Sequence, residues 1–145
     1  MPFKLNISEK GKAWRLQAET PELMGKSIGD KINGSEINAD LAGYEFEITG
    51  ASDIAGFPLS KNVEGVGLKK LLLKKGWGMR ESFPQGLRRK KTVRGKVISE
   101  KVIQINLNTL KEGKKSLAEI FPDQNKKEEA KTEKTEALVQ EVTAQ

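Results

Sequence analysis

The sequence predicts a small, mainly β domain, built as a barrel-like or rolled antiparallel sheet with glycine-rich basic loops. Three observations favour this fold class. Four stretches alternate apolar and polar residues with a period of two, as half-buried strands do. Helix signals are few. Glycine recurs at short intervals between residues 50 and 95, where it separates short segments of chain.

The four alternating stretches cover residues 3–8, 14–19, 44–49 and 103–108. Every second residue in them is apolar and the residues between are polar, so one face of each strand is expected to be buried. Residues 9–12 are predicted to form the hairpin turn between the first two strands. The inward side chains are expected to be Phe3, Leu5, Ile7, Trp14, Leu16, Ala18, Tyr44, Phe46, Ile48, Ile103, Ile105 and Leu107.

One or two short helices complete the predicted domain. Thr20 is expected to be an N-cap with Pro21 in the first helical position, and Gly25 ends this segment after one or two turns. Ser116 and Glu119 have the spacing of a capping box, and Pro122 closes the short helix that they start.

A fifth candidate strand is residues 71–73, a run of three leucines. This run predicts a strand buried on both sides, or its structure is ambiguous.

The chain is predicted to hold one domain, residues 1–122, followed by a charged tail, residues 123–145. The tail is rich in Lys, Glu, Thr and Gln, and this composition favours disorder or a solvated helix around residues 127–142. Hydrophobic residues make up 36% of the whole chain, which predicts a modest core.

The composition argues against enzyme chemistry. The chain contains no cysteine and no histidine, which excludes disulfides, thiolate zinc sites and the commonest general base. We therefore expect no catalytic residues, no cofactor and no metal site. No apolar run approaches the ~18 residues of a membrane span, and residues 1–10 lack the apolar core of a signal peptide. The chain is expected to be soluble and intracellular, with no membrane partner and no small-molecule substrate.

The positive charge is concentrated in one central segment. Residues 65–98 hold 11 basic residues and one acid, for a net charge of +10, whereas residues 1–60 carry a net charge of −3. Solvated charge runs are common, and a run of four cations alone would not decide between solubility and binding. A segment this one-sided favours a surface that binds a polyanion. An anionic membrane would require an amphipathic helix, which this segment lacks, so the pattern favours nucleic acid.

Residues 90–98 predict a strand, because a mid-helix Gly95 beside β-branched residues disfavours a helix. Val93 and Val97 are expected to point inward. The other face is expected to carry Lys90, Thr92, Arg94 and Lys96. Same-face neighbours in a strand lie ~6.6–6.8 Å apart, so these side chains would form a regular row.

Trp77 lies between two glycines within the basic segment. It is expected either to pack in the core or a loop, or to stack on a base. Nothing in the chain matches a helix-turn-helix, a zinc finger or the aromatic motif of an RNA-recognition domain. Phosphate contacts by themselves carry no sequence information. Specificity is therefore expected from RNA shape, from neighbouring proteins or from Trp77.

Other candidate motifs favour structural roles. Asp53 is better explained as a turn or Asx cap than as a catalytic acid, because no basic or nucleophilic partner lies near it in the sequence. Residues 65–70 lack the spacing of a phosphate-binding loop. Glu45 and Glu47 fall on the predicted exposed face of a strand.

Several of these segments together resemble one family. The stretches GYEFEITGASDIAGFP (43–58), LLLKKGWGMR (71–80), RRKKTVRGKVIS (88–99) and QINL (104–107) occur in this order. They resemble the archaeal and eukaryotic small-subunit ribosomal protein number six of the "e" type, and the resemblance covers roughly residues 1–121. It implies a β-rich, barrel-like domain that binds rRNA near the foot of the small subunit and has no catalytic activity.

This chain departs from the family pattern in three places. Ala51 stands where the family has a second glycine, and residues 79–84 are less basic than the family's loop. The long C-terminal helix with phosphorylated serines, typical of eukaryotic members, is replaced by the short Lys/Glu tail. These departures favour an archaeal-type protein.

We therefore predict a structural constituent of the small ribosomal subunit, located in the cytoplasm, whose partners are rRNA and neighbouring ribosomal proteins. The alternatives are an RNA- or DNA-binding regulator that acts off the ribosome, and an adaptor that uses the tail. The predicted RNA-binding residues are Lys69, Lys70, Lys74, Lys75, Trp77, Arg80, Arg88, Arg89, Lys90, Lys91, Arg94 and Lys96.

Overall fold

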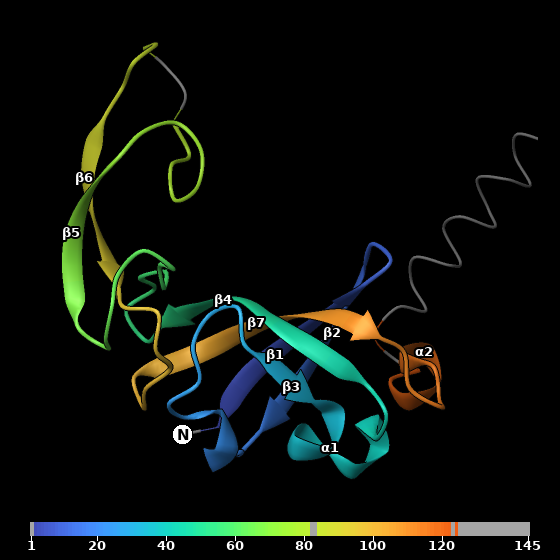
Figure 1. Ribbon diagram of the computed structural model, residues 1–145. Coiled ribbons are helices and arrows are strands. Elements are labelled where there is room, and N and C mark those ends of the chain that lie inside the picture. Colours follow the sequence, from blue (N-terminus) through green and yellow to red (C-terminus); the bar gives the residue numbers. More distant parts are fainter. Residues whose placement is uncertain (1, 82–83, 123, 125–145) are drawn as a thin grey trace, which may run out of the picture.

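The computed structural model describes residues 2–81, 84–122 and 124 (Figure 1). The predicted tail falls almost entirely outside these residues. Seven strands follow one another along the chain: β1 (Phe3–Glu9), β2 (Lys12–Ala18), β3 (Lys31–Asn33), β4 (Glu45–Asp53), β5 (Leu68–Leu73), β6 (Arg89–Arg94) and β7 (Val102–Lys111). The short helical segments are η1 (Pro21–Leu23), α1 (Gly34–Ile37), η2 (Ala39–Leu41) and α2 (Leu117–Ile120). The predicted mainly β class is confirmed.

Five of the strands form one sheet in the order β2-β1-β7-β4-β3. Strands β1 and β7 pair in parallel, and the other neighbours are antiparallel. The sheet is therefore mixed, with β2 and β3 as its two edges, and it does not close into a barrel. The prediction named a barrel-like or rolled antiparallel sheet, and its antiparallel pairing was wrong for β1 and β7. Strands β1 and β7 come from opposite ends of the domain's sequence, and local periodicity carries no information about their relative direction.

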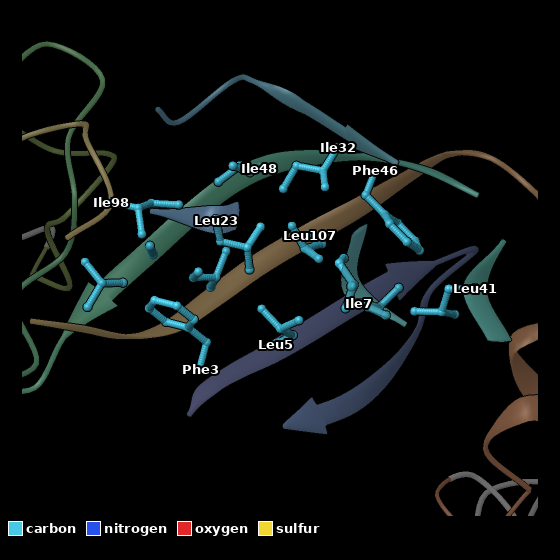
Figure 2. Packing of buried hydrophobic residues seen from close by; sticks show 14 of the residues in the cluster. Phe3, Leu5, Ile7, Leu23, Ile32, Leu41, Phe46, Ile48, Ile98 and Leu107 are labelled. Atoms are coloured by element: carbon cyan, nitrogen blue, oxygen red, sulfur yellow. The ribbon is translucent and has the colours of Figure 1, made fainter. Parts of the chain in front are cut away.

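The hydrophobic core lies on one face of this sheet. Leu5, Ile7, Phe46, Ile48 and Leu107 are fully buried, as their alternation predicted. Figure 2 shows their side chains pointing into one space, which Leu23, Leu41 and Ile98 close from the segments outside the sheet. Full burial of one such side chain is worth ~1.5–3 kcal/mol, so this cluster is the main source of stability.

The predicted alternation holds with weaker burial in β2 and fails at the start of β7. Leu16 and Ala18 are only half-buried, because β2 is an edge strand of the sheet. Ile103 is half-buried, whereas its neighbour Val102 is buried. The register between β4 and β7 shifts beside Asp53, and an extra residue in a strand pair moves the following side chains to the other face.

The predicted hairpin turn and capping box are present, whereas the predicted Thr20 cap makes no hydrogen bond. Glu9 pairs with Lys12 across a tight turn in which Lys10 has φ 47° and Gly11 has φ 82°, as the right-handed twist of a hairpin requires. Ser116 and Glu119 form the capping box that starts α2. The segment after Thr20 is a single 3-10 turn, and the Thr20 side chain makes no cap hydrogen bond.

The helical segments α1 and η2 were not predicted. They form a compact corner in which Gly34 packs directly on the backbone of Leu41. A Cβ at Gly34 would lie 2.0 Å from the Leu41 carbonyl oxygen, so only glycine fits there. Such short turns bury few side chains and leave almost no periodic signal in the sequence.

Candidate nucleic-acid interface

Strands β5 and β6 form a separate two-stranded antiparallel sheet that projects from the five-stranded sheet (Figure 1). The pairing runs from Leu68 opposite Arg94 to Leu73 opposite Arg89. We call residues 68–94 the basic hairpin. It contains most of the cations that the sequence placed in the central segment.

The register distributes side chains over both faces of the basic hairpin. Directly paired residues share a face, so Lys70 and Lys90 lie on the same face as Leu68 and Leu72. Leu72 is 58% exposed. The leucine run was expected to be buried on both sides or was left ambiguous, and burial on both sides was wrong. The opposite face is partly covered, because Leu71 and Leu73 are half-buried and Val93 is buried.

The predicted parity of residues 90–98 holds only in part. Val93 is fully buried, but β6 ends at Arg94, and Val97 is half-buried while Ile98 enters the core. The break occurs at Gly95, where a Cβ would lie 2.0 Å from the carbonyl oxygen of Gly65. The chain bends where these two backbones touch, and the alternation of a straight strand stops.

Arg94 was predicted to lie on the exposed cationic face, and this is wrong. Its side chain is 7% exposed and pairs with Asp53, whose side chain is 2% exposed. Nε and Nη2 of Arg94 donate to Asp53 Oδ2 at 2.9 Å and 2.5 Å, and Nη1 donates to the Val66 carbonyl oxygen at 2.7 Å. Asp53 Oδ1 accepts a hydrogen bond from the Ile54 amide. The Gly56 amide donates to the Asp53 carbonyl at 2.9 Å, so Asp53 begins a turn, which is one of the two structural roles expected for it.

This ion pair lies where the basic hairpin joins the five-stranded sheet. The Arg94 amide donates to the Pro58 carbonyl at 2.9 Å, and the Ser60 amide donates to the Arg94 carbonyl at 2.9 Å. Asp53 is the last residue of β4, so Arg94 joins the end of β6 to the end of β4. A buried pair of this kind carries positional specificity more than net stability.

The remaining cations of the segment are largely free of carboxylates. Arg89 pairs with Glu81, and Lys96 is half-buried and pairs with Glu64. With Arg94 also paired, eight of the eleven cations have no carboxylate partner within the part of the chain that the structure describes. These eight are Lys69, Lys70, Lys74, Lys75, Arg80, Arg88, Lys90 and Lys91, of which only Lys91 is half-buried. The surface is thus strongly electropositive.

Trp77 lies in the loop after β5, which bends back toward the five-stranded sheet (Figure 1). Its side chain is 54% exposed and takes no part in the hydrophobic cluster, so packing in the core is excluded. It lines a groove together with residues of the turn at 59–62.

Nothing in the described ranges, 2–81, 84–122 and 124, suggests catalysis. No group of three or more acidic side chains could hold a metal ion there, and no helix in that part is long and apolar enough to cross a membrane. Asp53 is occupied by Arg94, and Glu45 forms an ion pair with Lys111 at 2.7 Å. Asp53 and Glu45 therefore have structural partners.

The fold and this surface define a class of protein: a small β domain that presents a cation-rich hairpin to a polyanion. Comparison with protein families identifies which one. The model of ribosomal protein S6e matches residues 3–122, and the chain belongs to this family. Its members are structural proteins of the small ribosomal subunit and not enzymes. The resemblance carried by RRKKTVRG and its upstream partners is confirmed.

Three similar curated proteins come from archaea. The small ribosomal subunit protein eS6 of Nanoarchaeum equitans is 44% identical over 121 residues, which cover 81% of this chain and 88% of that protein. The eS6 of Methanosphaera stadtmanae is 36% identical, with 89% of this chain and 99% of that protein covered. That of Methanothermobacter thermautotrophicus is 40% identical, covering 83% and 96%.

Proposed function

We propose that this chain binds the RNA of the small ribosomal subunit through the basic hairpin, as a structural component of cytoplasmic ribosomes with other ribosomal proteins as neighbours. The observation that carries the proposal is the set of eight cations without carboxylate partners among the described residues, gathered on and beside one projecting hairpin. Family membership favours this role over a regulator that acts off the ribosome. The adaptor alternative rests on the tail, which lies outside the described residues apart from Gln124.

The mechanism is charge neutralisation by a rigidly presented surface. Arg80 and Arg88 offer planar forks that pair with two phosphate oxygens at once, and the lysines act as point charges. Cations on both faces of the hairpin allow it to enter between two phosphate backbones. Arg94, which the sequence placed among the RNA contacts, is assigned a positioning role, because its guanidinium is already saturated by Asp53 and Val66.

Salt dependence tests this assignment. Each neutralised phosphate contributes ~0.7–0.9 to the slope of log affinity against log salt. The variant K74Q/R88Q/K90Q removes three unpaired cations of the basic hairpin. We expect it to lower the slope by about 2–3 in filter binding to archaeal small-subunit rRNA. The matched control, K4Q/K31Q/K114Q, removes the same charge from exposed positions elsewhere and should leave the slope unchanged.

Equal slopes for the two triple variants would contradict the hairpin assignment. Sedimentation tests the ribosomal role separately. The chain should follow the small subunit stoichiometrically through a gradient in moderate salt. A chain that remained at the top of the gradient would overturn the structural role and leave the off-ribosome regulator as the explanation.

A further inference from the structure

We propose that the groove between Trp77 and residues 59–62 binds one unstacked nucleobase, from a bulged or single-stranded nucleotide. The inference rests on the proposed RNA-binding function and adds a contact that reads something other than phosphate. The groove has a volume of ≈ 400 Å³, which lies within the usual range of small-ligand sites.

One wall of the groove is the indole of Trp77, presented by a tight turn. The Met79 amide donates to the Gly76 carbonyl at 3.1 Å, so residues 76–79 form a closed turn with the tryptophan at its second position. Gly76 and Gly78 have φ of 129° and 76°, which side-chain-bearing residues rarely adopt. Among the described residues the only ring pair in contact is Tyr44 with Phe46, so no aromatic side chain of that part of the chain occupies the face of Trp77.

The opposite wall is a turn fixed to the base of the basic hairpin. The Val63 amide donates to the Ser60 carbonyl at 3.3 Å, and the Lys96 amide donates to the Val63 carbonyl at 2.8 Å. The Asn62 amide donates to the Ser60 hydroxyl at 3.3 Å. These bonds set the position of the exposed Asn62. Its side-chain amide has no hydrogen-bond partner in the described part of the chain and offers both donors and an acceptor to the edge of a base.

The floor of the groove is apolar, and one cation, Lys61, lines it. Ile28 and Leu59, both buried in the core cluster, contribute the apolar floor. Lys61 lines the groove, and Lys74 and Lys75 precede Trp77 in its own loop. An aromatic face, an amide and cations are the three kinds of group that proteins use for the π-face, the edge and the phosphate of a nucleotide. A protein partner that inserted an apolar side chain into the groove would use only the aromatic face.

A base held here would give the protein a preference that phosphate contacts cannot supply. Stacking of one base on an aromatic side chain typically changes affinity by about tenfold, equivalent to ~1.4 kcal/mol. A base inside a continuous helix cannot reach the indole face. The site therefore selects RNA in which one nucleotide is extruded from the stack.

The experiment compares two short RNA hairpins that differ by a single nucleobase. One carries a bulged adenosine, and the other carries an abasic residue at the same bulge. Wild type is expected to bind the first about tenfold more tightly. Trp77→Ala should abolish this ratio, and Trp77→Phe should retain most of it, because phenylalanine keeps an aromatic face. Lys90→Gln should weaken binding to both RNAs equally and leave the ratio intact, which makes it the matched control.

Fluorescence adds a readout that reports the site directly. The chain has two tryptophans, and Trp14 is 3% exposed whereas Trp77 is 54% exposed. Binding of the bulged RNA should quench wild-type emission, and the abasic RNA should quench it less. If wild type bound both RNAs equally with a normal salt slope, the base site would be wrong while the proposed function stood. If neither RNA bound in a salt-dependent manner, the proposed function itself would fail.

Discussion

The five-stranded sheet and the basic hairpin are both built from β-strands, but the sheet buries apolar side chains and the hairpin exposes leucines and cations. In the sheet, Leu5 and Phe46 are completely buried. In the hairpin, Leu68 and Leu72 are 51% and 58% exposed, and unpaired lysines flank them. An isolated two-stranded hairpin is marginally stable at best in water. The sheet therefore supplies the stability, and the hairpin depends on its junction with the sheet.

The cationic surface and the buried apolar core lie in different parts of this domain. Eight cations close together repel one another, and this repulsion destabilises the free hairpin. The junction offsets it with Arg94 and Asp53, with backbone hydrogen bonds to Pro58 and Ser60, and with the buried side chains of Val63 and Val93. RNA that neutralises the cations would remove the repulsion, so binding is expected to stabilise the hairpin selectively.

The largest difference between the two regions should appear on truncating an apolar side chain. Phe46→Ala removes a fully buried ring that stacks on Tyr44 with centroids 5.5 Å apart. We expect it to lower the free energy of unfolding by ~3–5 kcal/mol in chemical denaturation. Leu72→Ala, in the hairpin, should change it by no more than ~0.5 kcal/mol. Similar losses for both variants would mean that the hairpin is covered by something in solution.

The junction should be nearly as sensitive. Arg94→Leu leaves Asp53 buried without its cation and should cost about 3 kcal/mol. The double variant D53L/R94L removes both charges and should cost much less than the single change, because no uncompensated charge remains. Thermal unfolding of the three proteins measures this. A double variant as unstable as R94L would show that packing at the junction matters more than the ion pair.

A smaller effect is expected where the hairpin backbone meets the loop at residues 65–67. Gly95→Ala would place a Cβ 2.0 Å from the Gly65 carbonyl oxygen, and the loop must shift to admit it. A cost of ~1–3 kcal/mol is expected, together with faster amide hydrogen exchange in β5 and β6. Gly67→Ala is the matched control, because nothing lies within 4 Å of a Cβ there and its φ is not positive. Unchanged exchange in the Gly95 variant would count against a tight junction.

The smallest expected effect lies at the far end of the sheet. Burial raises the pKa of the Glu9 carboxyl, and the nearby Glu112 raises it further, although Lys10 opposes this. A carboxyl with a raised pKa in the folded state binds its proton more tightly in the folded than in the unfolded protein. The folded protein therefore loses stability as the pH rises through the titration of this carboxyl. Glu9→Gln should therefore stabilise the protein at pH 7, by no more than ~0.5 kcal/mol. The difference should vanish at pH 3, and a loss of stability at pH 7 would contradict this sign.

The sequence by itself determined the local features of both regions. A period of two placed Leu5, Ile7 and Ile48 on the buried face, because the side of a strand is set by neighbouring residues alone. The charge count located the basic hairpin, and the order of motifs around RRKKTVRG identified the family. Each of these signals lies within a few residues of chain and is independent of how the strands are arranged.

Only the tertiary structure decided what distant segments do to one another. The parallel pairing of β1 with β7 joins segments about a hundred residues apart, and Arg94 meets Asp53 across 41 residues. Parity predicted an exposed Arg94, but a buried carboxylate from another strand binds it. Trp77 gains a groove because residues 59–62 face it. No local pattern carries these contacts, since they arise from packing between elements whose relative positions only the complete fold defines.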